Sequence, residues 1–334
     1  MYGIIFYEKE KSNDPFSPEE LFSGVEKMQI KELKQNEIYS LIDEDFLKLF
    51  NEEHREYIKR VYYNKYIAFC EIIGKKPCSF ESFFSNMHRR HIQMYQTCCP
   101  FCGYIAVEFF DKTKIKDNSI DFCRNCGRDS LLVNFTKQTD RFMRIQNLID
   151  YGLAKYKENH PNTSEIELKN DCIQMEITEL ASIIEVFFRD YFEALTFIKM
   201  DGSTNSFIKE TILKSANNDF MNIEKANPLF KKAFGIDLKN QLKPDIWNDL
   251  VDIANIRNMM VHNNGKIDKR FKESKTYLRN KDKIIDNMII LDNGDIIKYY
   301  ANVIPAVIEI TKLYVEEYYA QRNRLIANYY YNQI

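Results

Sequence analysis

Apolar residues recur at intervals of three and four along most of this 334-residue chain, a spacing that predicts α-helices. The clearest run predicts a long core helix over 171–198. We also expect 13–96 to be helical, with one helix ending at Gly74 and another beginning at Ser79. Further helices are predicted over 44–73, 136–158, 218–234, 244–261 and 299–329.

Other segments depart from helical spacing. Residues 105–110 have the composition of a strand, and apolar pairs on both sides of 292–295 predict a β-hairpin. Residues 160–163 are the best candidate linker. The fold class we expect is mainly α, an N-terminal helical region with a small inserted β ribbon and then a helical bundle. The predicted domains are an N-terminal helical region (1–96), a ribbon (97–130), a connecting helix (131–160) and a bundle (161–334).

Composition supports a helical chain with packed cores. Hydrophobic residues make up 45% and aromatic residues 14%, while only 10 glycines and 8 prolines are present. The net charge of −2 does not indicate a nucleic-acid binder, so any RNA contact must use a local patch. Neither a signal peptide nor a membrane-spanning segment is predicted, and we expect a cytoplasmic protein without membrane contact.

Four of the eight cysteines form two C-x2-C-Gly motifs. In each motif two thiolates project from a tight turn, where glycine lets backbone amides point at sulfur. Paired spacing without a secretion signal predicts a metal site rather than disulfides. Four protein ligands leave no open position for water, so we expect a structural Zn²⁺ in a fold that resembles a zinc ribbon. The predicted ligands are Cys99, Cys102, Cys123 and Cys126.

The predicted ribbon has balanced charge, with five basic and five acidic side chains between 97 and 130. Because nucleic-acid affinity depends on uncompensated cations, a protein partner is at least as well supported as RNA. The basic cluster at 88–91 either contacts RNA phosphates or is solvated helix surface. A contact surface and the ribbon's own core are equally open for the aromatic residues Phe101, Tyr104, Phe109 and Phe110.

A permanent cation interrupts the apolar face of the helix predicted over 244–261. At about 100° per residue the apolar side chains fall within an arc about 140° wide, and Arg257 projects near its centre. An unpaired buried charge costs several kcal/mol, so Arg257 must face a partner, a cleft or an anion. Asn258 and His262, four apart, share the rim of that face. The alternative is an arginine that reaches solvent and a surface histidine.

This arrangement resembles the RNxxxH signature of the HEPN superfamily. Its members are helical bundles, and many are metal-independent RNA endonucleases. Arg257, Asn258 and His262 match every fixed position of the signature, which implies a HEPN-like bundle over 161–334 with these residues as its catalytic site. HEPN toxins silenced by AMP transfer carry a tyrosine shortly after the motif histidine. That control is in doubt here, because the residues that follow are Asn263, Asn264 and Gly265.

The implied reaction uses the RNA 2′-hydroxyl as nucleophile and leaves a 2′,3′-cyclic phosphate and a 5′-hydroxyl. His262 is the natural proton shuttle, because an imidazole exchanges protons near neutral pH. Arg257 would hold the scissile phosphate and stabilise the charge of the pentacoordinate state. Asn258 would orient the histidine or bind the phosphate. Whether His262 acts as acid, base or positioning group stays open.

The segment after the signature is basic. Residues 266–283 hold eight basic and three acidic side chains, a local excess of 8 − 3 = +5. Such an excess can bind an RNA backbone, although a solvated surface is an equal alternative. Glu176 and Glu179 on the long core helix are candidate partners for Arg257. The residues expected to bind RNA are Lys266, Lys269, Arg270 and Lys272, and the other four basic residues are Lys275, Arg279, Lys281 and Lys283.

HEPN nucleases generally dimerise so that two signatures share one cleft, which implies a homodimer or a higher homo-oligomer. A zinc ribbon ahead of a HEPN domain also resembles the ring-activated zinc-finger ribonucleases of phage defence. The function we expect is an endoribonuclease toxin of bacterial anti-phage or stress defence, activated when the ribbon region senses a protein trigger such as a phage protein. The alternative is a non-catalytic adaptor, whose ribbon binds protein or nucleic acid and whose bundle only dimerises.

Overall fold

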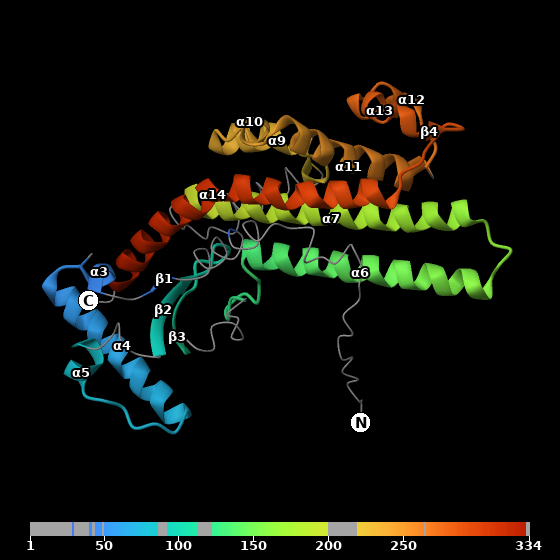
Figure 1. Ribbon diagram of the computed structural model, residues 1–334. Helices are drawn as coiled ribbons and strands as arrows, with labels where there is room; N and C mark the ends of the chain where they lie inside the picture. The colour runs from blue at the N-terminus through green and yellow to red at the C-terminus, as the bar shows by residue number, and fades with distance from the viewer. Residues whose placement is uncertain are drawn as a thin grey trace.

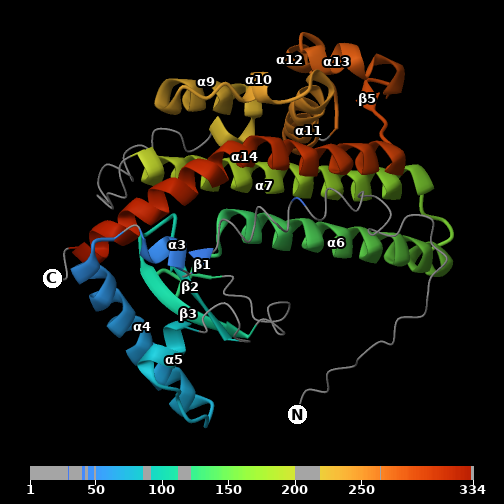
Figure 2. The ribbon, with the colours of Figure 1, turned by 60° about the vertical axis from the view of Figure 1, so that its left-hand side comes forward.

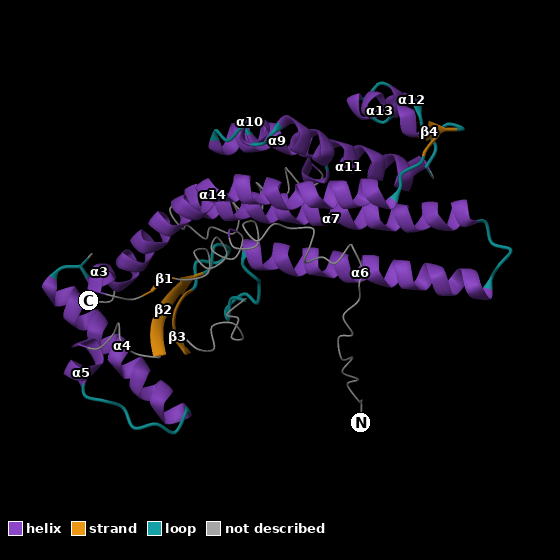
Figure 3. Cartoon of the chain, in the orientation of Figure 1, coloured by secondary structure: helices purple, strands orange, loops and turns teal. Residues whose placement is uncertain are grey.

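The computed structural model describes residue 29 and residues 40–41, 44–48, 50–85, 92–111, 122–199, 219–263 and 265–331. The fold is mainly α, as predicted, with long helices side by side and small strands toward one end (Figures 1 and 3). In the part of the chain so described, no helix is long and apolar enough to cross a membrane.

Four long helices form the bundle: α6 (Leu131–Asn159), α7 (Glu165–Lys199), α11 (Pro244–Asn263) and α14 (Asn293–Tyr331). Helix α7 packs against the other three. Its periodic apolar positions are buried in one large core, with Ile177 and Leu180 fully inaccessible to solvent. The spacing of apolar residues at threes and fours therefore predicted this central helix correctly, because a helix that packs against three others needs apolar side chains on several sides. The predicted linker at 160–163 joins α6 to α7.

Short elements lie over α11 and beyond its end (Figure 1). A 3-10 turn (Asp219–Met221) leads into α9 (Ile223–Phe234), which Gly235 ends in a left-handed conformation, and α10 (Leu238–Gln241) follows. After α11 come α12 (Lys269–Lys272), α13 (Lys275–Arg279) and a 3-10 turn (Lys281–Lys283). Strands β4 (Ile284–Ile285) and β5 (Met288–Ile289) form a hairpin before α14.

The N-terminal part has its own smaller core. Helices α3 (Glu44–Leu47), α4 (Glu52–Ile72) and α5 (Phe80–Ser85) accompany an antiparallel sheet of order β1-β2-β3. The strands are β1 (Ser40–Leu41), β2 (Ile92–Cys98) and β3 (Ile105–Asp111). Ile326, near the end of α14, is fully buried in this core. Figure 2 shows the end of α14 lying beside α4. One helix thus contributes to both cores.

The prediction that 13–96 is helical throughout is wrong in the described part. Residues 92–98 form the central strand β2, and 40–41 pair with it. Gln96 occupies a fully buried position in β2, where Tyr62 donates a hydrogen bond to its Oε1 at 3.2 Å. A buried glutamine interrupts the apolar alternation by which a strand is identified. The helix predicted over 44–73 is also two helices, because Asn51 caps α4.

The predicted hairpin around 292–295 is likewise wrong. The turn of the hairpin is at Asp286 and Asn287, both with positive φ, and α14 already begins at Asn293. Asp292 caps that helix, since its Oδ1 accepts from the backbone amide of Asp295 at 2.9 Å. Short polar residues serve both purposes, so the sequence allowed either arrangement. The basic cluster at 88–91 lies outside the described residues.

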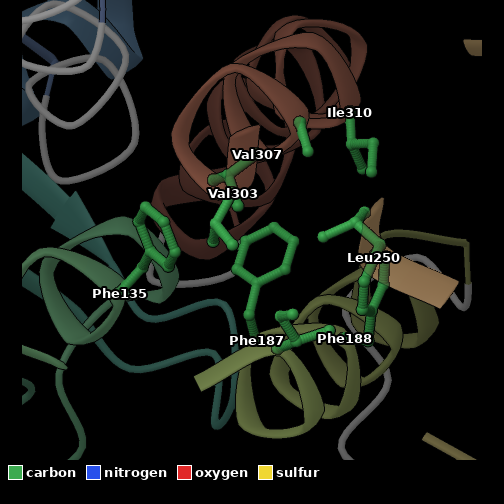
Figure 4. Close-up of a pocket in the computed structure, with 9 residues that line it drawn as sticks. Phe135, Phe187, Phe188, Leu250, Val303, Val307 and Ile310 are labelled. Carbon is green, nitrogen blue, oxygen red and sulfur yellow. The ribbon is translucent and has the colours of Figure 1, made fainter. Parts of the chain in front are cut away.

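A small void lies where α6, α7, α11 and α14 meet. Figure 4 shows apolar side chains of all four helices, including Phe187, Leu250 and Val307, pointing toward it. Its volume of about 10 Å³ has room for about one water molecule, and its lining offers no polar partner. The void is a gap in packing and not a substrate site.

Candidate functional site

The four predicted metal ligands are brought together. The Sγ atoms of Cys99, Cys102, Cys123 and Cys126 all lie within 4.8 Å of one another. Cys99 Sγ is 3.8 Å from Cys126 Sγ, and Cys102 Sγ is 3.6 Å from Cys123 Sγ. A tetrahedral site with Zn–S bonds of about 2.3 Å has sulfur–sulfur edges of about 3.8 Å. The cluster therefore fits a metal ion such as Zn²⁺. Cys98, adjacent to a ligand, is buried in β2 and is not part of the cluster.

Both turns that carry these thiols have the same backbone. In each, a glycine with positive φ (Gly103, Gly127) donates its amide to the carbonyl of the first cysteine, at 2.9 and 2.7 Å. In each, the amide of the first cysteine donates to the carbonyl five residues later, that of Tyr104 or of Arg128. A side chain at either glycine would be strained at that φ. The C-x2-C-Gly spacing thus determines two turns of matching geometry, which we call the knuckles (99–104 and 123–128).

The surroundings of the sulfurs differ. Burial raises the pKa of Cys99 and of Cys123. Burial acts the same way on Cys102, but hydrogen bonds from the Tyr104 amide and the Asn125 side chain outweigh it and lower the Cys102 pKa. Asn125 Nδ2 is 3.6 Å from Cys102 Sγ. Donors aimed at sulfur stabilise thiolate, the form that ligates metal.

The first knuckle is packed against the bundle and is not a separate surface element. Cys98, Cys99 and Phe101 belong to the large core of the bundle. Phe101 is 4% exposed and lies beneath the guanidinium of Arg128, whose Cζ is 3.6 Å from the ring centroid, whereas Tyr104 is 42% exposed. The sequence left open whether Phe101 forms a contact surface or packs in a core, and the structure shows that it packs in a core. The side chains of Phe109 and Phe110 lie outside the described set.

The predicted Arg–Asn–His residues lie on the last two turns of α11, which ends at Asn263, two residues beyond the predicted end. Arg257 and Asn258 are half-buried, and His262 is exposed. Arg257 Nη1 donates to Asn258 Oδ1 at 3.0 Å. Val261, an apolar residue next to His262, is 43% exposed, whereas Met260 is buried, so the last turn of the helix leaves the core after Met260.

Glu176 and Glu179 are not partners of Arg257, which corrects that expectation. Glu179 pairs with Arg141 of α6, and Glu176 interacts with Gln146 and Asp150 of α6. Both carboxylates therefore serve the α6–α7 contact. Among the described residues no carboxylate lies within ion-pair distance of Arg257, and its hydrogen-bond partner is an amide.

The basic segment after α11 is held against the helix end. Asn263 Nδ2 donates to Asp268 Oδ2 at 2.8 Å, and Asp268 Oδ1 accepts from the Phe271 amide at 2.7 Å. Hydrogen bonds from Phe271 and Asn263 lower the pKa of Asp268. These contacts place the start of α12 next to the turn that bears His262. The four residues expected to bind RNA are all exposed: Lys266, Lys269, Arg270 and Lys272.

Two of the eight basic residues do not contribute to a basic surface. Arg279 pairs with Asp252 of α11, and Lys283 pairs with Asp295 of α14. Removing both leaves six basic and three acidic side chains in 266–283, an excess of 6 − 3 = +3 rather than +5. The remaining excess of positive charge is smaller, and its six basic side chains form no ion pair with the described residues.

Two buried carboxylates on α11 were missed at the sequence level. Asp249 accepts from Lys298 and Asn302 of α14 at 3.0 and 2.6 Å, and Asp252 also accepts from Asn280 at 3.2 Å. They fix α11 to α14 and α13. The available signal was their position among the apolar residues of the helix, where a charge must be paired.

Comparison of the chain with protein-family models, with curated proteins and with solved structures finds no match.

Proposed function

We propose that this protein is a metal-independent RNA endonuclease whose active site consists of Arg257, Asn258 and His262. The observation that carries the proposal is the state of Arg257. Its half-buried guanidinium has an amide oxygen as partner, whereas the half-buried Arg128 and Arg279 have carboxylates. A partly desolvated cation without a counter-charge attracts an anion such as a phosphate.

Asn258 orients the guanidinium. On an ideal helix Arg257 and His262 point about 140° apart, whereas Asn258 and His262 are only about 40° apart. The hydrogen bond from Arg257 to Asn258 draws the guanidinium toward the face that carries His262. The two side chains can then act on one phosphate. Asn258 is therefore a positioning residue for Arg257.

In the reaction we propose, a base removes the proton of the RNA 2′-hydroxyl and O2′ forms a bond to the adjacent phosphorus. The bond from phosphorus to O5′ breaks, and the leaving O5′ takes a proton. Arg257 stabilises the extra negative charge on the phosphorane oxygens. His262, exposed and in the last helical turn, is the group that moves one of the protons. The products are a 2′,3′-cyclic phosphate and a 5′-hydroxyl.

A second proton-transfer group is supplied by a second copy of the chain. One signature offers one histidine, and the reaction uses both a base and an acid. His262 and the neighbouring Val261 are both exposed, so this end of α11 is open to a partner surface. We propose a homodimer, or a higher homo-oligomer, in which two such ends face each other.

The remaining parts of the proposal concern the metal and the trigger. The four-cysteine site holds a structural Zn²⁺, because all four ligand positions come from protein and none remains for water. The N-terminal region and the knuckles keep the ribonuclease dormant until a protein trigger, such as a phage protein, binds there. The exposed Tyr104 beside the first knuckle offers one aromatic contact for it. The setting we propose is bacterial anti-phage or stress defence in the cytoplasm.

The test compares growth and RNA integrity in bacteria that express the wild type, Arg257→Ala or His262→Ala, with and without phage challenge. We expect triggered growth arrest and RNA fragmentation with the wild type and neither with the variants. Matched controls are Arg144→Ala and His160→Ala, two exposed residues on α6 or at its end, which should behave like the wild type. If the Arg257 and His262 variants act like the parent, the protein is an adaptor without catalysis.

A further inference from the structure

We propose that Arg128 couples the four-cysteine site to the core helix α7, so that loss of metal loosens the C-terminal half of that helix. The proposal does not depend on RNA cleavage. It assigns the metal site a second role, which is to control the stability of the bundle. The ion pairs that support the proposal join residues at least 62 positions apart in the chain.

Arg128 follows the last cysteine ligand by two residues and joins three parts of the molecule. Its Nη2 lies 3.1 Å from Asp190 Oδ1, and its Nη1 lies 2.7 Å from Glu193 Oε1, both on α7. Its planar group covers the ring of Phe101 in the first knuckle. Its own carbonyl accepts from the Cys123 amide at 2.8 Å. The position of Arg128 is therefore set by both knuckles.

The two carboxylates on α7 are buried, and both pair with this cation. Asp190 is 5% and Glu193 is 7% exposed, and they sit one helical turn apart. Asn134 of α6 donates to Asp190 Oδ2 at 2.8 Å, which satisfies one oxygen but brings no charge. Two like charges in a buried place destabilise the fold unless a cation lies between them. Arg128 supplies a cation from outside the bundle that pairs with both carboxylates, while the exposed Arg189 of α7 approaches Asp190 at the longer distance of 3.8 Å.

Coupling between two sites is reciprocal. If the metal-loaded knuckles hold Arg128 against α7, then the carboxylates on α7 must hold the knuckles in their metal-binding geometry. Groups behind the ligands of a metal site commonly change metal affinity by about 10–100-fold when they are removed. Substitution of these carboxylates, which are not themselves among the metal-ligand candidates, should therefore speed the release of Zn²⁺.

The experiment measures Zn²⁺ release from the full-length, zinc-loaded protein into a chromogenic chelator. We expect Asp190→Asn with Glu193→Gln to release Zn²⁺ roughly tenfold faster than the wild type. The matched control is Glu179→Gln, another α7 carboxylate paired with an arginine, Arg141, of a helix that bears no ligand. This control should release Zn²⁺ at the wild-type rate. If the double variant does not fold, Glu193→Gln alone is measured, with a smaller acceleration expected.

A second readout follows α7 itself. Hydrogen exchange of the wild type, before and after Zn²⁺ removal, should show faster exchange at 186–197 and unchanged exchange in α13, which packs on α11. An unchanged release rate in the carboxylate variants overturns the proposal. So does equal protection of α7 with and without metal, because the knuckles would then be held independently of the bundle.

Discussion

The central residue is Arg257, whose pairing differs from that of most half-buried cations in the described residues. Arg55 also donates to neutral oxygens, but these are backbone carbonyls next to its own helix. Arg128, Arg279 and Lys283 each pair with a carboxylate, which cancels their charge locally. Arg257 pairs with the neutral amide of Asn258 instead. An amide fixes the direction of a guanidinium without neutralising it, so its charge remains available to a ligand.

Two substitutions at Asn258 separate orientation from charge. Asn258→Ala removes a hydrogen bond to a charged group, and we expect RNA cleavage to fall about tenfold, as a loss of about 1.5 kcal/mol implies. Asn258→Asp keeps an acceptor but adds a counter-charge, and cleavage should fall further than with alanine. Single-turnover cleavage rates measure both. Equal or higher activity of the aspartate variant would contradict the role of Arg257 as an uncompensated cation.

A buried carboxyl on α7 makes stability depend on pH. Glu176 is 3% exposed, and burial, with the charge of Asp150, raises its pKa to about 7. A raised carboxyl pKa stabilises the fold fully below the ordinary value of 4.5, and this contribution is lost as pH rises toward and through 7. We therefore expect Glu176→Gln to raise Tm above pH 7 by a few degrees and to change it little near pH 4.5.

Thermal melts between pH 4.5 and pH 8.5 measure this effect. Glu179→Gln is the matched control, because Glu179 lies three positions along α7 and pairs with Arg141. It should give no such gain at high pH. If the Tm difference between Glu176→Gln and the wild type were the same at both ends of the range, the pKa of Glu176 would not be raised in the fold, which would contradict this account.

At the level of helices and strands, the sequence predicted the elements that depend on residues close together in the chain. The core helix α7 and the helix α11 follow from apolar spacing, and the knuckles follow from cysteine and glycine spacing. Strand β2 was missed because its buried Gln96 is satisfied by Tyr62, a residue 34 positions away. The hairpin was misplaced because aspartate and asparagine suit both turns and helix caps.

The basic segment around α12 gives a prediction of its own. With four alanines in place of its exposed cations, we expect weaker RNA binding and a flatter salt dependence. The slope of the logarithm of the association constant against the logarithm of salt should fall by up to about 3, since each phosphate contact to single-stranded RNA contributes about 0.7. Fluorescence anisotropy with a labelled RNA measures it. The substituted residues are Lys266, Lys269, Arg270 and Lys272.

The control carries four alanines in exposed lysines of the α9–α11 region and should keep the wild-type slope. An unchanged slope in the α12 variant would assign RNA binding to another surface. The lysines replaced in the control are Lys225, Lys232, Lys239 and Lys243.

At the scale of the whole molecule, long-range contacts join parts that the sequence presents as separate. Ile326 of α14 is buried in the N-terminal core, and Arg128 of the second knuckle pairs with two carboxylates of α7. Neither contact leaves a local pattern, so neither could be predicted. Figure 1 shows α12 and α13 far from the sheet. A trigger bound near the knuckles would thus act on the proposed site through α7 and α14.

The measurement that tests the account most directly is the chemistry of RNA ends produced by the purified, zinc-loaded protein in buffer without Mg²⁺. With the activating trigger present, the account predicts fragments that end in 2′,3′-cyclic phosphate and begin with 5′-hydroxyl, and no fragments from Arg257→Ala or His262→Ala. Fragments with 5′-phosphate ends, cleavage that requires added Mg²⁺, or wild-type activity in both variants would contradict it.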